Sequence, residues 1–274
     1  MLRWTFIAGA TAALIACSSP EEMVAGVEEG RSDTALDTLE QQTGAGAEAV
    51  AFSDSEEVEN GERTFNYSWP AQVSAIPALA EMLTNRRDEA LKGQKGEWAS
   101  SIADCPPEAF SCRNASFSLG WEVVANLENY LSLSSSFESY SGGAHGIYGR
   151  SALVWDRAKG AAVEPVQLFV SPKALQAAIG DEACAALNRE REKRRGAPVE
   201  QGSDSWADSC VAIDDTVLFI GSSNGKAFDR IGVYYGPYVA GPYAEGDFEF
   251  TLPVTAEVMD AVKPEYRGAF AAAQ

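Results

Sequence analysis

The chain has 274 residues, of which 46% are hydrophobic, 10% aromatic and 22% charged, a composition typical of a globular protein. Its length allows one large domain or two small ones. With 21 Lys and Arg against 40 Asp and Glu, the formal net charge is −19, so nucleic acid is a poor partner because its phosphates would be repelled. The single histidine, His145, excludes zinc sites and proton relays that need several histidines.

Residues 1–17 are typical of a bacterial lipoprotein signal peptide. Arg3 precedes a short apolar run over residues 6–16, which cannot span about 30 Å of hydrocarbon. The run ends in Leu14-Ile15-Ala16-Cys17, which resembles a lipobox, so Cys17 is predicted to carry lipid. An ordinary cleaved signal with an accidental cysteine is the alternative. Because Ser18 follows Cys17, we expect an exported protein anchored in the outer membrane and facing the periplasm.

Residues 18–61 are predicted to form a disordered acidic tether. Between Ser18 and Glu62 the sequence has thirteen acidic side chains against one basic side chain, Arg31. A stretch of this composition has too little apolar surface to offset the entropy lost on ordering, and its charges repel one another. We interpret it as a spacer; an acidic tail that binds a partner is the alternative.

Residues 62–160 are predicted to form a first α+β module. Alternating apolar and polar residues predict strands over 65–70, 117–125, 130–137 and 147–155, the second and third as an antiparallel hairpin. Pro77 is expected to begin a helix that runs to about Gly93.

Residues 161–274 are predicted to form a second α+β module. Ser171 and Pro172 are typical of a helix start, and Gly196 of a helix end. Five basic residues before Gly196 suit the negative end of the helix dipole, with a phosphate or an acidic partner as the alternative. Strands are expected over 217–220, 230–235 and 247–253. The predicted class is therefore α+β, with antiparallel sheets, helices packed on one face and two consecutive modules.

Four cysteines remain after Cys17, and in an oxidising compartment an even number predicts disulfides. Of the three possible connectivities we prefer Cys105–Cys112, which closes a short proline loop, together with Cys184–Cys210, which ties the second helix to the segment before a strand. The spacings do not fit zinc, and no Cys-x-x-Cys indicates a redox pair. We expect no metal and no cofactor.

Two blocks of sequence carry a family resemblance. The first is Tyr140-Ser141-Gly142-Gly143-Ala144-His145-Gly146, followed by Trp155-Asp156-x-x-x-Gly160 and Val166-x-Leu168-Phe169. The second is Val233-Tyr234-Tyr235-x-Pro237-Tyr238-x-x-x-x-Tyr243-Ala244-x-Gly246, ending near Phe250-x-Leu252-Pro253. Over residues 62–256 the chain resembles an extracytoplasmic family. That family includes the lysozyme-sensing portion of RsiV-like anti-sigma factors, the non-catalytic N-terminal region of PdaC-type peptidoglycan deacetylases, and envelope lipoproteins with a domain of unknown function.

The resemblance implies two consecutive α+β modules, PdaC-like and then RsiV-like, that sense or bind rather than catalyse. The deacetylase's catalytic domain needs several metal-binding histidines, and this chain has one. Candidate ligand-binding residues lie in the two blocks: Gly142, Gly143, His145, Tyr148, Tyr235, Tyr238 and Tyr243. The glycines suit a tight turn into the strand predicted over 147–155, and the aromatic rings of the tyrosines would stack on sugar rings. The competing interpretation places His145 and the tyrosines in structural packing.

Templates for catalysis do not fit this sequence. There is no Gly-x-Ser-x-Gly elbow to supply a nucleophile for His145 and no phosphate-binding glycine loop. Neighbouring acids such as Asp214 and Asp215 are better explained as solvated turns than as opposed catalytic carboxylates. We therefore expect a non-enzymatic envelope lipoprotein that binds a lysozyme-like protein or peptidoglycan. The alternatives are a cell-wall hydrolase or deacylase that uses His145, and a purely structural envelope protein.

Overall fold

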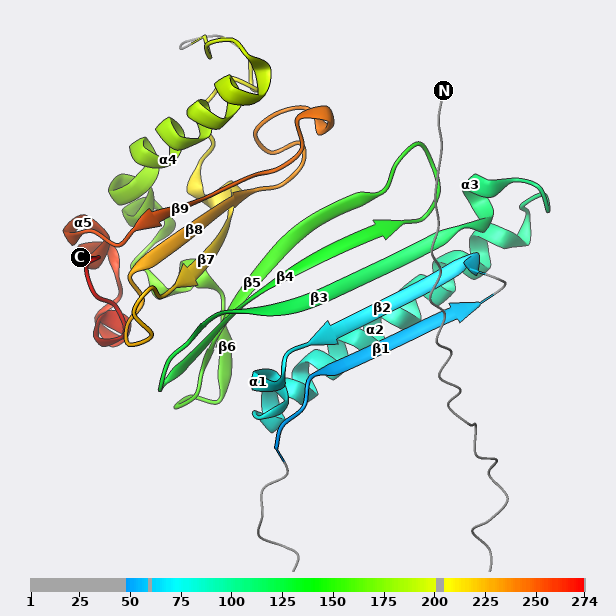
Figure 1. Ribbon diagram of the computed structural model, residues 1–274, viewed down its shortest axis with the longest axis horizontal. Helices are drawn as coiled ribbons and strands as arrows, with labels where there is room; N and C mark the ends of the chain where they lie inside the picture. The colour runs from blue at the N-terminus through cyan, green and yellow to red at the C-terminus, as the bar shows by residue number, and fades with distance from the viewer. Residues whose placement is uncertain (1–47, 59–60, 201–204, 274) are drawn as a thin grey trace, which may run out of the picture. The chain divides into compact units, whose positions relative to one another are not determined.

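The computed structural model describes residues 48–58, 61–200 and 205–273 (Figure 1). The predicted signal peptide, Cys17 and most of the predicted tether lie outside these residues. The strands are β1 (Phe52–Val58), β2 (Arg63–Trp69), β3 (Ala115–Asn126), β4 (Tyr130–Tyr140), β5 (Ile147–Asp156), β6 (Ala161–Val163), β7 (Val217–Gly221), β8 (Arg230–Tyr235) and β9 (Phe248–Pro253). The α-helices are α1 (Ala71–Ser74), α2 (Pro77–Ala103), α3 (Phe110–Arg113), α4 (Pro172–Arg195) and α5 (Ala256–Ala261). Short 3-10 turns are η2 (Pro165–Leu168), η3 (Ile213–Asp215), η4 (Tyr243–Glu245) and η5 (Pro264–Ala269).

The first sheet has the strand order β1-β2-β3-β4-β5-β6. All its neighbours pair antiparallel except β2 and β3, which are parallel because the chain crosses over through α2 between them. Alternate residues of each strand point to the same face. One face is covered by α2, whose Leu79 and Leu83 pack in one core with Phe65, Tyr67 and Trp121 (Figure 1).

The second sheet is antiparallel, in the order β7-β8-β9. Its helix α4 begins as predicted: the side chain of Ser171 accepts a hydrogen bond from the Ala174 amide at 3.0 Å. It ends at Gly196, whose φ of +67° suits a residue without a Cβ. The buried stripe Leu175, Ile179, Ala183 and Leu187 joins the core of this sheet. The predicted class is therefore confirmed: α+β, with two sheet modules.

The core under the second sheet also receives side chains from the first. Ala125 of β3, Leu127 of the β3–β4 turn and Val154 of β5 belong to the same buried cluster as the side chains of β7, β8 and α4. The long β3–β4–β5 strands therefore serve both cores.

The folded region begins earlier than the sequence predicted. Residues 52–58, expected to be part of the tether, form β1 and pair with β2. The acidic residues of β1 find basic partners on α2: Asp54 bonds Arg87 at 2.9 Å and Glu56 bonds Lys95 at 2.8 Å. The boundary at residue 61 is therefore wrong. Residues 48–274 contain 33 acidic and 19 basic side chains, so they carry a net formal charge of −14.

Both preferred disulfides are present in the structure. Cys105 is bonded to Cys112, with Cα atoms 5.9 Å apart, and Cys184 to Cys210, with Cα atoms 5.2 Å apart. Across the described residues, no helix combines the length and the apolar character needed to span a bilayer.

Candidate functional site

The loop between β4 and β5 is shaped by two glycines. Gly142 and Gly143 have φ values of +107° and +91°, which residues with a Cβ rarely adopt. A Cβ on Gly142 would lie 2.5 Å from the carbonyl oxygen of Ser111, so the loop approaches α3 too closely for any side chain at this position. The Tyr140 hydroxyl donates to the Gly143 carbonyl at 3.0 Å. These contacts fix the loop and position His145, two residues further on.

His145 lies in an aromatic cluster with Tyr148, Tyr238 and Tyr243. Its imidazole stacks on Tyr243, with ring centroids 4.0 Å apart and planes at 20°. Tyr238 and Tyr148 contact the same tyrosine, with centroids at 5.5 Å and 5.9 Å. The cluster thus joins the β4–β5 loop to the loop between β8 and β9.

One main-chain oxygen, that of Gly146, anchors the centre of the cluster. The Tyr243 hydroxyl donates to it at 2.9 Å. His145 Nδ1 lies 2.8 Å from the same oxygen, which requires Nδ1 to carry the hydrogen. His145 is exposed, and its partners among the described residues are a carbonyl and a phenol ring. This arrangement holds the imidazole against the Tyr243 ring, and among the described residues no carboxylate or hydroxyl is hydrogen-bonded to the imidazole.

Tyr238 is exposed, with 57% of its surface accessible. It is also the one described non-glycine residue with a positive φ, +68°. A left-handed backbone at a bulky residue costs free energy and is concentrated at binding and catalytic sites. Tyr148, by contrast, is half-buried, and burial together with the nearby Asp247 carboxylate raises the pKa of its hydroxyl.

The loop that carries Tyr238 and Tyr243 is held by cations at the end of α4. Arg191 is fully buried and donates twice to the Ala240 carbonyl. Arg195 makes two 2.9 Å bonds to the Glu245 carboxylate and one to Asp208. Three members of the basic cluster predicted at this helix end, Arg191, Arg194 and Arg195, therefore bind the chain's own loop segments.

The seven predicted ligand-binding residues separate into three groups. His145, Tyr148, Tyr238 and Tyr243 form the aromatic cluster, and Gly142 and Gly143 shape its loop. Tyr235 is different: it is fully buried in β8, its ring packs against Phe250 with centroids 5.6 Å apart, and it takes no part in the surface. Burial raises the pKa of its hydroxyl to about 12.

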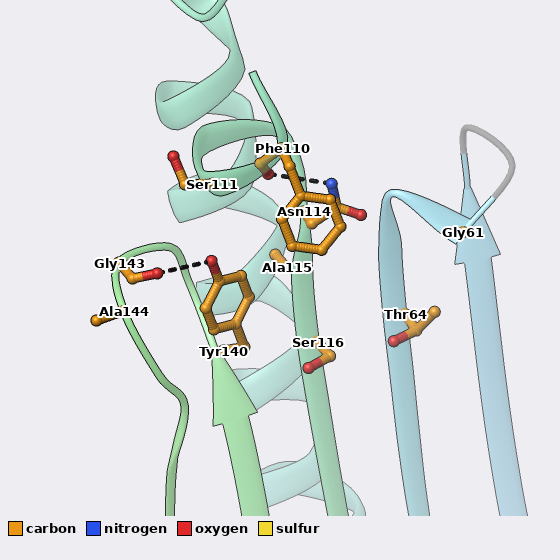
Figure 2. A pocket seen from close by; sticks show the side chains of 10 residues that line it. All are labelled: Gly61, Thr64, Phe110, Ser111, Asn114, Ala115, Ser116, Tyr140, Gly143 and Ala144. Atoms are coloured by element: carbon orange, nitrogen blue, oxygen red, sulfur yellow. Dashed lines mark hydrogen bonds between the residues drawn. The ribbon is translucent and has the colours of Figure 1, made fainter. Parts of the chain in front are cut away.

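A pocket of about 720 Å³ lies against the β4–β5 loop (Figure 2). Gly143 and Ala144 form one wall, α3 with Phe110 and Ser111 another, and the ends of β2, β3 and β4 the floor. The sequence did not reveal this pocket, because its residues come from three separate segments and only the segment with Tyr140, Gly143 and Ala144 belongs to a recognised motif. Among the described residues, no group of three or more His, Cys, Asp or Glu is placed to hold a metal ion.

The chain shares its fold with a solved bacterial structure. It aligns with a DUF3298 family protein from Pseudomonas aeruginosa at a TM-score of 0.50 and 15% identity, over 82% of this chain and 95% of that one. A DUF3298 family member from Bacteroides fragilis aligns at a TM-score of 0.47 and 15% identity, over 80% and 94% of the two chains. No protein-family model and no curated protein matches the sequence.

Proposed function

We propose that this protein is a non-catalytic binding module of the bacterial cell envelope, which binds peptidoglycan through the aromatic cluster. In this proposal Cys17 carries the lipid that anchors it to the outer membrane, facing the periplasm. Three observations support it: the lipobox-like signal, the resemblance to RsiV-like sensing domains and to the PdaC N-terminal region, and the shared fold with a DUF3298 structure.

The observation that carries the proposal is Tyr238. An exposed tyrosine held in a left-handed backbone, beside the stacked pair His145 and Tyr243, presents an aromatic surface that folding alone does not require. The face of an aromatic ring suits the axial C–H groups of a pyranose. A non-catalytic role fits the surroundings of His145, which has no carboxylate or nucleophile beside it among the described residues.

Co-sedimentation with purified peptidoglycan tests this function. The wild-type chain is expected in the pellet, and Tyr238→Ala is expected to weaken binding about 3- to 10-fold, the value of one aromatic contact. Trp206→Ala is the matched control, because Trp206 is also exposed, at 52%, and lies outside the cluster. No sedimentation of the wild type, or equal sedimentation of wild type and Tyr238→Ala, would contradict the proposal.

A cationic, lysozyme-like protein is a second candidate ligand, favoured by the net charge of −14 over residues 48–274. Opposite charges speed association, and the effect fades with salt. Retention of lysozyme on the immobilised chain at both low and moderate salt would support this candidate. Retention at low salt alone indicates attraction by charge without a fitted surface, and no retention at either salt eliminates the candidate.

The lipid anchor has its own test. Labelled palmitate is expected to be incorporated into the wild-type chain, and the protein to fractionate with outer membranes. Cys17→Ala is expected to abolish both. Incorporation that survives this substitution would show that Cys17 is not the modified residue.

A further inference from the structure

We propose that the pocket beside the β4–β5 loop is a preformed binding site for a neutral N-acetylated sugar unit. The inference rests on the proposed function and extends it, because it names the class of ligand and adds a second contact on the β4–β5 loop that also carries His145. The pocket's volume of about 720 Å³ lies in the range of small-molecule sites.

The lining of the pocket is uncharged and combines apolar area with hydroxyl and amide groups. No Asp, Glu, Lys or Arg is among its lining residues, although more than a fifth of the chain is charged. An ionic ligand would find no counter-charge here, and burying its charge unpaired would be costly. The ligand that fits is therefore a neutral molecule with hydroxyl and amide groups.

Three residues whose side chains carry a hydroxyl lie side by side across the floor of the pocket. Thr64 of β2 pairs in register with Ser116 of β3, and Ser116 pairs with Tyr140 of β4. Paired residues point to the same face, and neighbouring strands lie about 4.8 Å apart. Figure 2 shows the three side chains on the pocket side of their strands. The hydroxyls of Thr64 and Ser116 can bind hydroxyls of a sugar ring, while the Tyr140 hydroxyl donates to the Gly143 carbonyl and its ring adds apolar area.

Aromatic and amide groups complete the lining. The rings of Phe110 and Tyr140 lie with centroids 6.3 Å apart and planes at 38°, and Phe110 is 69% exposed (Figure 2). They offer apolar area to ring C–H groups or to an acetyl methyl. The Asn114 amide donates from Nδ2 to the Phe110 carbonyl at 3.0 Å, so its Oδ1 is the atom that can accept an acetamido N–H.

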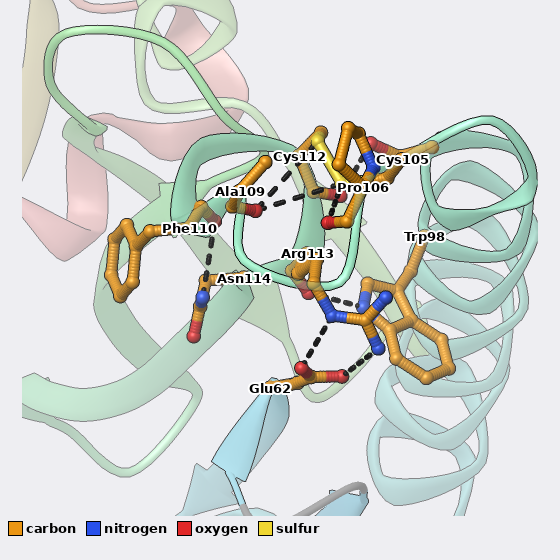
Figure 3. Close-up of a disulfide and its surroundings, with 10 residues drawn as sticks. Glu62, Trp98, Cys105, Pro106, Ala109, Phe110, Cys112, Arg113 and Asn114 are labelled. Carbon is orange, nitrogen blue, oxygen red and sulfur yellow. Dashed lines mark hydrogen bonds and ion pairs between the residues drawn. A yellow bond between two sulfur atoms is a disulfide. The ribbon is translucent and has the colours of Figure 1, made fainter.

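A disulfide, two hydrogen bonds and an ion pair hold the wall that carries Phe110 and Asn114 (Figure 3). The Cys105–Cys112 disulfide closes the loop, and Ser101 Oγ and Trp98 Nε1 donate to the carbonyls of Cys112 and Arg113 at 2.8 and 2.7 Å. Arg113 in turn makes two bonds, of 2.6 and 2.9 Å, to the Glu62 carboxylate. A wall held in this way loses little conformational freedom when a ligand binds, which favours affinity.

Calorimetric titration of the full-length lipid-free chain (Cys17→Ala) with tri-N-acetylchitotriose tests the site. The parent chain is expected to bind the trimer and to bind maltotriose, which has no acetamido groups, at least fivefold more weakly. Phe110→Ser is expected to weaken trimer binding about fivefold. Ser116→Ala is expected to weaken it about two- to threefold, and Ser118→Ala, on the same exposed face but outside the pocket, not at all. Unchanged thermal unfolding of each variant shows that it is folded.

The outcomes separate the two proposals. No binding of the trimer, equal binding of maltotriose, or equal binding by Phe110→Ser overturns the pocket site, while sedimentation with peptidoglycan that depends on Tyr238 would leave the proposed function standing. Conversely, Tyr238→Ala is expected to keep full affinity for the trimer. Trimer binding that depends on Phe110, without any sedimentation, would support the pocket and refute peptidoglycan binding at the aromatic cluster.

Discussion

The guanidinium group of Arg191 donates two hydrogen bonds to a single oxygen, the Ala240 carbonyl, from Nε at 3.0 Å and Nη2 at 2.6 Å. Its Nη1 donates to Ser209 O and Asn188 Oδ1, and the side chain is fully buried. Burial lowers the pKa of this guanidinium, since desolvation disfavours its charge. The cation therefore connects α4 to the loop that presents Tyr238.

Replacing Arg191 by Met is expected to lower the free energy of unfolding by about 3 kcal/mol, because it leaves buried carbonyls without donors. Arg189→Met, on the exposed side of α4, is the control and is expected to change stability by less than about 0.5 kcal/mol. Urea denaturation measures both. Equal midpoints for the two variants would show that the buried hydrogen bonds do not stabilise the fold.

Gly142→Ala is expected to destabilise the protein by about 1–3 kcal/mol, because φ is +107° and the new Cβ would meet the Ser111 carbonyl. Gly96→Ala is expected to have the opposite sign, a gain of about 0.5–1 kcal/mol, since Gly96 lies inside α2 with open space around its Cβ position. Thermal unfolding of the two variants compares them directly. A Gly142→Ala protein as stable as Gly96→Ala would refute the tight approach of the loop to α3.

Tyr235→Phe is expected to leave stability at pH 7 unchanged or higher by up to about 1 kcal/mol, because the buried hydroxyl has no hydrogen-bond partner among the described residues. The folded-state pKa of about 12 lies above the ordinary value of 10.0. The neutral phenol's contribution is therefore fully present below pH 10 and is lost as the pH rises through 12. At pH 11 the variant should therefore retain about 1.4 kcal/mol of unfolding free energy that the wild type loses by ionising Tyr235. Unfolding free energies measured from pH 8 to 11 test this, and parallel curves would contradict it.

Glu56→Gln is expected to lower stability at pH 7 by about 1–3 kcal/mol, because it removes the carboxylate that bonds the buried Arg63. Glu57→Gln, at the next, exposed position of β1, is the control and is expected to have little effect.

The same substitution changes the pH dependence. Hydrogen bonds from Lys95 and Arg63 lower the pKa of Glu56 below 4.5. Its contribution is thus present above pH 4.5 and is lost as the pH falls through the lowered pKa. The free energy of unfolding of the variant should fall less on acidification than that of the wild type. Equal decreases in the two proteins below pH 4.5 would contradict this account.

The sequence predicts elements well where local signals decide them. The helix cap at Ser171, the end at Gly196 and the hairpin of β3 and β4 follow from residue type and alternation. Strand β1 was missed because Asp54 and Glu56 are neutralised by Arg63, Arg87 and Lys95. These partners lie 7 to 39 residues away along the chain and leave no local pattern. The parallel pairing of β2 with β3 is likewise a property of the crossover.

The candidate site was predictable only in part. The glycines and His145 stand together in one motif, so their loop could be located from sequence. Tyr235 and Tyr238 are three residues apart and chemically identical, yet one is buried in the middle strand of a sheet and the other exposed in a strained turn. Residue type does not reveal that difference, because packing from both sides of β8 determines it.

Strands β3, β4 and β5 contribute to both hydrophobic cores, and this affects how the chain can be truncated. Because Ala125, Leu127 and Val154 complete the interior beneath the second sheet, a fragment cut after Gly160 would deprive the C-terminal half of part of its own interior. We therefore expect the two halves to unfold as one cooperative unit despite their separate sheets, and a truncated half to aggregate rather than fold on its own.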